Sequence, residues 1–338
     1  MSRHLFRIVL LVWTASLTKA TELAIQDTRF TIDGKPAFLL GVSYYGGLGA
    51  PERFVKPDLD DMQRDGFNWL RVWANWAAFD NKVAAVDVDG SSREPYLTRL
   101  KELVAACDKR GMIVDVTLSR GNGVAGPPRL QKPEEHVRAV ETLVETLKPY
   151  RNWYLDLGNE RSIKDSRFVS HETLKKLRDR AKELDPKRLI TASHASDDEE
   201  FIAELEAYLK TTRVDFVSQH RIRSDETAGQ TEAMTRRYVA RMKEIGVMVP
   251  VHYQEPFRRG FGDWEPDAED YVRDLRGAIK GGAAGWCFHN GDQRKGPDAL
   301  PRRSFDLRER RLYDQLDEVE KTVVKRLNAV MDEAAPPK

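Results

Sequence analysis

The stretch WYLDLGNE, residues 153–160, shows the pattern on which the fold prediction rests. Its first five residues are mostly large and apolar on both alternating faces, and it then gives way to polar Asn159 and charged Glu160. A short run of this kind is typical of a parallel strand that is covered on both sides. The stretch VPVHYQE, residues 249–255, ends at Glu255 in the same way. We therefore predict two buried strands that each end in a glutamate.

Apolar runs of this kind recur eight times and alternate with helical patterns. The strands are predicted at residues 38–44, 69–73, 112–118, 153–157, 189–192, 214–218, 247–252 and 284–288. Between them, apolar residues recur at helical spacing, as at Leu97, Leu100 and Val104, and a last apolar stripe runs from Leu312 to Val330. Eight strand–helix units predict a single-domain (β/α)8 TIM barrel, which needs about 250 residues.

Other local signals define the ends of the domain. Residues 30–37 contain Asp33-Gly34 between extended runs, which predicts a β-hairpin that plugs the lower end of the barrel. Pro133 and Pro266 are predicted in the first turns of helices. The barrel is predicted to span residues 21–332, followed by a disordered tail at residues 333–338.

The first twenty residues have the order of a secretory signal peptide. Arg3 and Arg7 precede the apolar run at residues 8–13, and Thr18 and Ala20 supply small residues before a cleavage site. The apolar run is shorter than the about 20 residues that a membrane span needs. We predict a secreted or periplasmic protein, with an uncleaved anchor or a misplaced start as the alternatives.

Composition narrows the class of ligand. Of 338 residues, 41% are hydrophobic and 32% are charged, which is typical of a soluble globular enzyme. The net charge is only +1, so the protein has no overall positive field that would attract nucleic acid or an anionic membrane. Cys107 and Cys287 lie in apolar surroundings and are predicted to be buried thiols. We find no zinc-ligand spacing and expect no metal, no cofactor and a monomer.

In a barrel of this kind, function lies at the carboxyl ends of the strands. Those ends combine two glutamates with amide, aromatic and basic side chains, which is what a sugar site requires. Two carboxyl groups from distant strands also suit cleavage of a glycosidic bond. The predicted catalytic pair is Glu160 and Glu255, and the predicted substrate-binding residues are Arg71, Asn159, Trp286, His220, Tyr253, Tyr45, Trp73 and His194.

The order of these residues resembles a clan A glycoside hydrolase, closest to the cellulase-like family five barrels, from residue 30 to about residue 330. The likeness begins with DGKP and GVSYY at residues 33–45 and with NWLRV at residues 68–72, where the strand ends in Arg71 near a nucleophile. It continues with Asn159-Glu160 on strand four, Glu255 on strand seven and Trp286 on strand eight. The resemblance implies a retaining enzyme.

The same resemblance implies individual roles. Glu160 would be the acid/base, Asn159 would hold the sugar 2-hydroxyl, Glu255 would be the nucleophile, and Trp286 would stack under the reactive sugar. The family often has a histidine at the end of strand three and a tyrosine on strand six, whereas this chain has Ser119-Arg120 and QHRIR at residues 219–223. Tyr253, two residues before Glu255, is a candidate to replace that tyrosine.

The two roles require different protonation states. Glu160 is expected to hold its proton near neutral pH, and Glu255 is expected to be ionised beside Arg71. We predict an exported retaining glycoside hydrolase acting on a β-linked polysaccharide or oligosaccharide. The alternative is a non-catalytic carbohydrate-binding barrel with a degenerate site. A lyase or aldolase is disfavoured, because we find no strand-end lysine for a Schiff base and no metal cluster.

Overall fold

The computed structural model describes residues 20–78, 82–121, 125–260, 263–292, 294 and 303–334. The predicted signal peptide lies outside the described residues except for Ala20. Of the predicted tail, Glu333 and Ala334 belong to the last helix, and residues 335–338 lie outside the described part. In the described residues, no helix combines the length and apolar character that crossing a membrane would demand.

A seven-stranded parallel sheet forms most of the barrel wall. Its order is β11-β12-β4-β5-β6-β7-β8, which is the order of a closed (β/α)8 ring opened at one position. The strands are β4 (Leu39–Ser43), β5 (Trp69–Trp73), β6 (Ile113–Thr117), β7 (Trp153–Asp156), β8 (Ile190–Thr191), β11 (His252–Tyr253) and β12 (Gly285–Phe288). The four strands from β4 to β7 are buried along their whole length, as the sequence pattern predicted.

Residues 214–220 close the ring at the remaining position. On one side the Asp215 amide donates to the Ile190 carbonyl at 2.9 Å, and β9 (His194–Ala195) pairs in parallel with β10 (Gln219–His220). On the other side Val217 forms a parallel bridge with Val251. The predicted (β/α)8 barrel is therefore confirmed.

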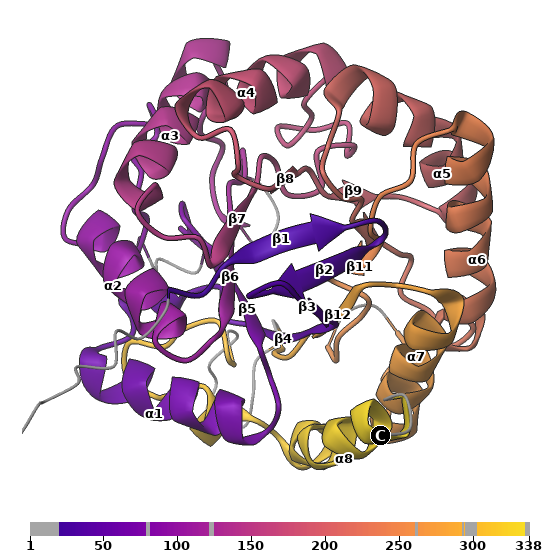
Figure 1. The fold of residues 1–338 in the computed structure, drawn as a ribbon. Helices are drawn as coiled ribbons and strands as arrows, with labels where there is room; N and C mark the ends of the chain where they lie inside the picture. Colours follow the sequence, from indigo (N-terminus) through magenta and orange to yellow (C-terminus); the bar gives the residue numbers. More distant parts are fainter. Residues whose placement is uncertain are drawn as a thin grey trace, which may run out of the picture.

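The helices form a ring outside the sheet (Figure 1). In the described part of the chain they are α1 (Glu52–Arg64), α2 (Tyr96–Asp108), α3 (Pro133–Leu147), α4 (His171–Leu184), α5 (Asp198–Glu206), α6 (Thr227–Ile245), α7 (Ala268–Gly281) and α8 (Glu318–Ala334). The predicted inner face of α2, with Leu97, Leu100 and Val104, is buried.

Helix starts follow the capping side chains more closely than the apolar stripes. Pro133 is in the first turn of α3, as predicted. Pro266 is not in the first turn of α7, because Asp267 caps that helix by accepting from the amides of Glu269 and Asp270. The last apolar stripe was predicted to be helical from Leu312, but α8 begins at Glu318, after a separate 3-10 turn, η4 (Tyr313–Gln315).

A small antiparallel sheet lies across one end of the barrel (Figure 1). Its strands are β1 (Leu23–Gln26), β2 (Arg29–Ile32) and β3 (Lys35–Ala37). Asp33 and Gly34 both have positive φ, 55° and 78°, as a two-residue type I′ hairpin requires. The predicted plug is thus present, with β1 as a third strand that the sequence pattern did not identify. Phe30 packs edge-on against Phe216, 5.1 Å between ring centroids, and seals this end.

Aromatic side chains fill the barrel above the plug. Trp69 donates from its indole nitrogen to the Tyr154 hydroxyl at 2.9 Å, and its ring packs edge-on against His252. The facing positions are glycines. A β-carbon on Gly41 would lie 1.6 Å from the Trp69 ring, and one on Gly285 would lie 2.4 Å from the His252 ring. Glycine at these positions is what lets the two large rings enter the barrel.

Gly41→Ala should therefore lower the free energy of unfolding by about 1–3 kcal/mol, because the buried Trp69 ring has to move. The matched control is Gly229→Ala on an exposed position of α6, where nothing lies within 4 Å and the change should stabilise by about 0.5–1 kcal/mol. Chemical denaturation of both variants measures the difference. Equal stability of the two variants would contradict this packing.

Candidate active site

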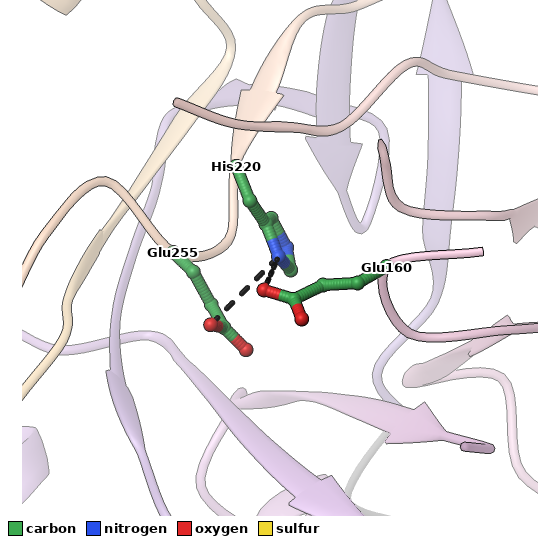
Figure 2. A group of neighbouring side chains, drawn as sticks. All are labelled: Glu160, His220 and Glu255. Atoms are coloured by element: carbon green, nitrogen blue, oxygen red, sulfur yellow. Dashed lines mark ion pairs between the residues drawn. The ribbon is translucent and has the colours of Figure 1, made fainter. Parts of the chain in front are cut away.

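The two predicted catalytic glutamates meet across the barrel. Glu160 follows β7 and Glu255 follows β11, and their carboxylates face the same imidazole, His220 at the end of β10 (Figure 2). One oxygen of each carboxylate lies within 4.8 Å of the other. Glu160 has φ 50°, a left-handed backbone conformation that is uncommon for a residue with a side chain and often occurs at functional turns. The structure therefore brings together residues 95 positions apart in the sequence.

His220 lies between the two carboxylates. Its Nδ1 is 3.5 Å from Glu160 Oε1 and 3.7 Å from Glu255 Oε2, and the residue is 2% exposed. Within the described residues, neither ring nitrogen of His220 has a hydrogen-bond partner. Nδ1 therefore lies at ion-pair distance from both carboxylates but beyond hydrogen-bond geometry, and a polar ligand could complete the hydrogen bonding of this buried imidazole.

Arg71 connects the nucleophile candidate to the strands below it. Its Nη1 donates to Glu255 Oε1 at 2.5 Å, and its Nη2 donates to Asp156 Oδ2 and to Asn159 Oδ1, each at 2.9 Å. Its Nε lies 3.1 Å from Asp115 Oδ2. The predicted proximity of Arg71, Asn159 and Glu255 is present in the structure.

The pKa of Glu255 follows the predicted direction. Burial alone would raise it, but His220, His289 and Arg71 favour the charged form and hold the pKa of Glu255 well below its usual range. An ionised carboxylate at this position suits a nucleophile.

The protonation prediction for Glu160 is wrong in the ligand-free protein. Burial would raise its pKa, but His220, Arg223 and Arg167 outweigh burial and lower the pKa of Glu160 to about 2. Arg167 is the closest cation, with Nη1 2.6 Å from Glu160 Oε2, and its other edge pairs with Asp165. Glu160 is therefore ionised at neutral pH, because the His220 imidazole and, to a smaller extent, the Arg223 and Arg167 guanidinium groups favour its charged form.

Tyr253 does not replace the strand-six tyrosine. Its hydroxyl shares a hydrogen bond of 2.7 Å with Thr235 Oγ1 on α6, so the side chain faces the helix layer. The strand ends at Tyr253, and alternation does not continue to Glu255. Arg223, from the loop after β10, contacts the nucleophile candidate instead, with Nη2 3.0 Å from Glu255 Oε2.

Tyr45 and Trp73 lie beside Arg71, the residue that contacts Glu255, and their predicted role in substrate binding stays a prediction. The Tyr45 hydroxyl is 2.9 Å from His289 Nε2, and its ring lies 5.0 Å from the Trp73 ring. Arg71 lies over both rings at just under 6 Å. Within the described residues, the indole nitrogens of Trp73 and of neighbouring Trp76 have no hydrogen-bond partner. This wall therefore contains two buried indole donors without a hydrogen-bond partner among the described residues.

Trp286 and His194 are not brought to the glutamates. Trp286 points toward the helices and donates to Asp274 Oδ2 on α7 at 2.6 Å, because alternation along β12 turns Cys287 and His289 inward. His194 likewise faces the helix layer, with Nδ1 3.1 Å from the Tyr208 hydroxyl. The predicted stacking role of Trp286 and the predicted ligand contact of His194 are both corrected.

Several residues of the site were not selected from the sequence. Asp115 and Asp156 were hidden inside apolar strand runs, where a lone aspartate is itself an unusual signal. Arg167, Arg223 and Arg258 lie on loops, where the alternation of a strand cannot be used to predict which way a side chain points. His289 follows β12 at an inward position and lies 3.9 Å from Glu255 Oε2.

Glu160, His220 and Glu255 could in principle hold a metal ion, because one ligand atom of each lies within 4.8 Å of the others. Their carboxylates, however, already accept from guanidinium groups. Arg167 contacts Glu160 at 2.6 Å, and Arg71 contacts Glu255 at 2.5 Å. A cation would have to displace those groups, so the arrangement fits ion pairs better than a metal.

Comparison with known proteins supports the fold. No family model matches the sequence, and no curated protein matches it. Solved structures do match: an exo-β-1,4-mannosidase from Opitutaceae bacterium strain TAV5 (18% identity, TM-score 0.61, 90% of this chain and 62% of that one) is similar. An endo-1,4-β-mannanase from Rhizomucor miehei is similar too, with 13% identity and a TM-score of 0.60 over 92% of this chain and 99% of that one. A glycoside hydrolase family 5 protein from Bacteroides vulgatus also matches, with 15% identity and a TM-score of 0.66 over 93% of this chain and 72% of that one.

The fold is thus that of family 5 glycoside hydrolase barrels, and the resemblance stated from the sequence is confirmed at that level. This chain spans less than two thirds of the length of the mannosidase structure, but almost the whole length of the fungal mannanase.

Trp286→Phe should lower the free energy of unfolding by about 1–3 kcal/mol, because it removes the donor to the buried Asp274 carboxylate. It should leave the KM for a glycoside unchanged. Trp73→Phe is the matched control beside Arg71, and it should raise KM or lower kcat. Thermal unfolding and steady-state kinetics of both variants test the assignment, and a raised KM in a fully stable Trp286→Phe protein would restore Trp286 to the site.

Proposed function

We propose that the protein is a retaining glycoside hydrolase that cleaves a β-linked polysaccharide or oligosaccharide. The observation that carries this proposal is the spacing of the two carboxylates, one oxygen of each within 4.8 Å. Retaining enzymes hold their two carboxyl groups about 5–5.5 Å apart, whereas inverting enzymes need about 6.5–9.5 Å for an intervening water.

In this proposal Glu255 attacks the anomeric carbon and forms a glycosyl–enzyme ester. Arg71 holds the carboxylate by its Oε1, while Oε2 lies on the side of His220 and accepts from Arg223. Glu160 gives a proton to the departing oxygen, and then removes a proton from the water that releases the sugar. Asn159, fixed through its carbonyl oxygen to Arg71, has its amide group as a donor for a sugar hydroxyl.

The ion pair between Arg167 and Glu160 favours a second candidate, a non-catalytic carbohydrate-binding barrel. An ionised Glu160 cannot protonate a leaving group, and Arg167 is one of the groups, with His220 and Arg223, that keep it ionised. Hydrolysis of activated aryl glycosides separates the two candidates, since a binding protein would retain affinity without turnover.

The similar structures suggest where a substrate search should begin. Two of them are named as a β-1,4-mannosidase and an endo-1,4-β-mannanase, so β-1,4-mannosides belong at the head of the panel. Product analysis of oligosaccharides then distinguishes endo from exo action.

We also propose export and action as a monomer. The basic, apolar and small-residue order of the first twenty residues supports export. The Thr21 amide nitrogen lies 2.7 Å from Asp108 Oδ1, so cleavage after Ala20 would place the new ammonium group against a carboxylate. That contact would stabilise the mature N-terminus.

Glu160→Ala should slow hydrolysis of substrates with poor leaving groups far more than that of activated aryl glycosides, which need little protonation. A loss of about 10²–10⁴-fold is expected for the former. Azide should partly restore turnover by attacking the glycosyl–enzyme. Steady-state kinetics on both substrate types measure the effect, and equal losses in a folded variant would remove Glu160 from the acid/base role.

Glu255 should be labelled by a fluorinated glycoside that reacts quickly and is released slowly. Mass spectrometry should place the label on Glu255, and Glu255→Gln should abolish it while the thermal transition persists. NMR of the first product should show the anomeric configuration of the substrate. An active enzyme whose product is inverted would make Glu255 at most a general base.

A further inference from the structure

Guanidinium groups surround the two glutamates from the side of the loops. Arg167 comes from the loop after β7, Arg223 from the loop after β10, and Arg258 from the loop after β11. Their side chains are mostly covered: Arg167 is 19% exposed and Arg223 is 9% exposed, and Arg258 as a residue is 2% exposed. A site for a neutral sugar needs donors and aromatic faces, whereas these three loop arginines add cationic donors on the loop side of Glu160 and Glu255.

Two of these arginines crowd one another. The pKa of Arg258 is lowered to about 10, first by burial and then by the like charge of Arg223. Its Nη1 is also 3.2 Å from His289 Nε2, and the pKa of that histidine is depressed by burial and further by Arg258 and Arg223. Glu255 and Glu160 oppose this lowering of the Arg258 pKa, and a bound anion would oppose it further.

Arg167 is arranged to change partners. Its Nη2 and Nε hold the Asp165 carboxylate at 2.8 and 3.2 Å, so the side chain stays in place without Glu160. Its Nη1 contacts Glu160 Oε2 at 2.6 Å. Another acceptor placed between them would take over Nη1 and would remove the contribution of Arg167 to the lowered pKa of Glu160.

We infer that the site takes an anionic glycan, in which a carboxylate or sulfate group on the sugar beside the scissile bond binds Arg167 in place of Glu160. The inference rests on the proposed function, because it names the substrate class of the same site. Arg223 and Arg258 lie within the electrostatic reach of Glu160 and add to the attraction for the anion. Nearby His220 faces both glutamates, with Nδ1 at ion-pair distance from each (Figure 2).

The sugar anion would also couple binding to chemistry. In the ligand-free protein His220, Arg223 and Arg167 together stabilise the ionised form of Glu160. A substrate anion that pairs with Arg167 would weaken the contribution of Arg167 and, as a like charge close to Glu160, would raise the pKa of Glu160 toward the value that an acid needs. A neutral glycan brings no such charge.

Binding of disaccharides with a sulfur bridge, which resist hydrolysis, tests the inference separately from turnover. Isothermal titration of the full chain compares a uronate disaccharide, its carboxyl-reduced neutral form, and a sulfated form of that neutral disaccharide. The uronate or the sulfated form should bind about ten- to hundredfold more tightly than the neutral one at low salt, and the advantage should shrink as salt rises. The two charged arms show which anion the site prefers.

Arg167→Gln should remove most of that advantage, and Arg167→Lys should keep part of it. Arg308→Gln is the matched control: Arg308 pairs with Asp306 two residues away, Nη2 to Oδ2 at 2.7 Å, as Arg167 pairs with Asp165. This control should bind all three ligands as the wild type does. Thermal unfolding confirms that each variant is folded.

The outcomes separate the two proposals. Equal binding of the neutral and both charged disaccharides, or an anion advantage that survives Arg167→Gln, would overturn the anionic-glycan inference whether or not the protein hydrolyses glycosides. An anion advantage that depends on Arg167, without hydrolysis of any glycoside, would uphold the inference on ligand class and reject only the enzymatic function.

Discussion

The buried guanidinium of Arg71 is the interaction on which the candidate site depends. A charge this far from solvent is tolerated only when it is paired and hydrogen-bonded. Here the partners are Asp115 and Asp156 from neighbouring strands and Glu255 from across the barrel. One cation therefore orders three carboxylates. Because β5, β6 and β7 are adjacent in the sheet, the position of Glu255 is tied to their register.

Three carboxylates around one arginine cannot all ionise at low cost in a closed interior. Burial, with a smaller contribution from Asp156, raises the pKa of Asp115 to about 7, although Arg71 opposes the shift. Asp115 in turn accepts from the Tyr154 hydroxyl at 3.0 Å and from Gln254 Nε2 at 2.6 Å. These hydrogen bonds connect the aromatic side chains at the base of the barrel to Asp115. Asp115 and Glu255 share Arg71, so the ionisation of Asp115 affects how strongly Arg71 stabilises the charged form of Glu255.

Most of the fold could be predicted because the spacing of apolar residues along the sequence indicates where each strand and helix lies. Strand-sized apolar runs and helical stripes identify the eight units, and Glu160, Asn159, Glu255 and Arg71 follow from reading strand ends. Side-chain direction was predicted less well. Trp286 and Tyr253 lie in short strands, where a shift of one residue in the alternation decides whether a side chain points into the barrel or toward the helices. Loop arginines such as Arg167 could not be placed at all, because their contacts arise only from tertiary structure.

The two glutamates make opposite demands on the same electrostatic field. Positive charge near Glu255 keeps a nucleophile ionised, and Arg71 and His220 supply it. The same kind of charge near Glu160 opposes an acid, and it comes from His220, from Arg223 and from Arg167, whose Nη1 lies 2.6 Å from Glu160 Oε2. One oxygen of each carboxylate lies less than 5 Å from the other, so a fixed positive group that keeps Glu255 ionised also favours ionisation of Glu160. A charged group on the ligand could shift the pKa of Glu160 only while the ligand is bound. The loop that carries Arg167 beside Asp165 is therefore the part of the site where substrate charge would decide whether Glu160 acts as an acid.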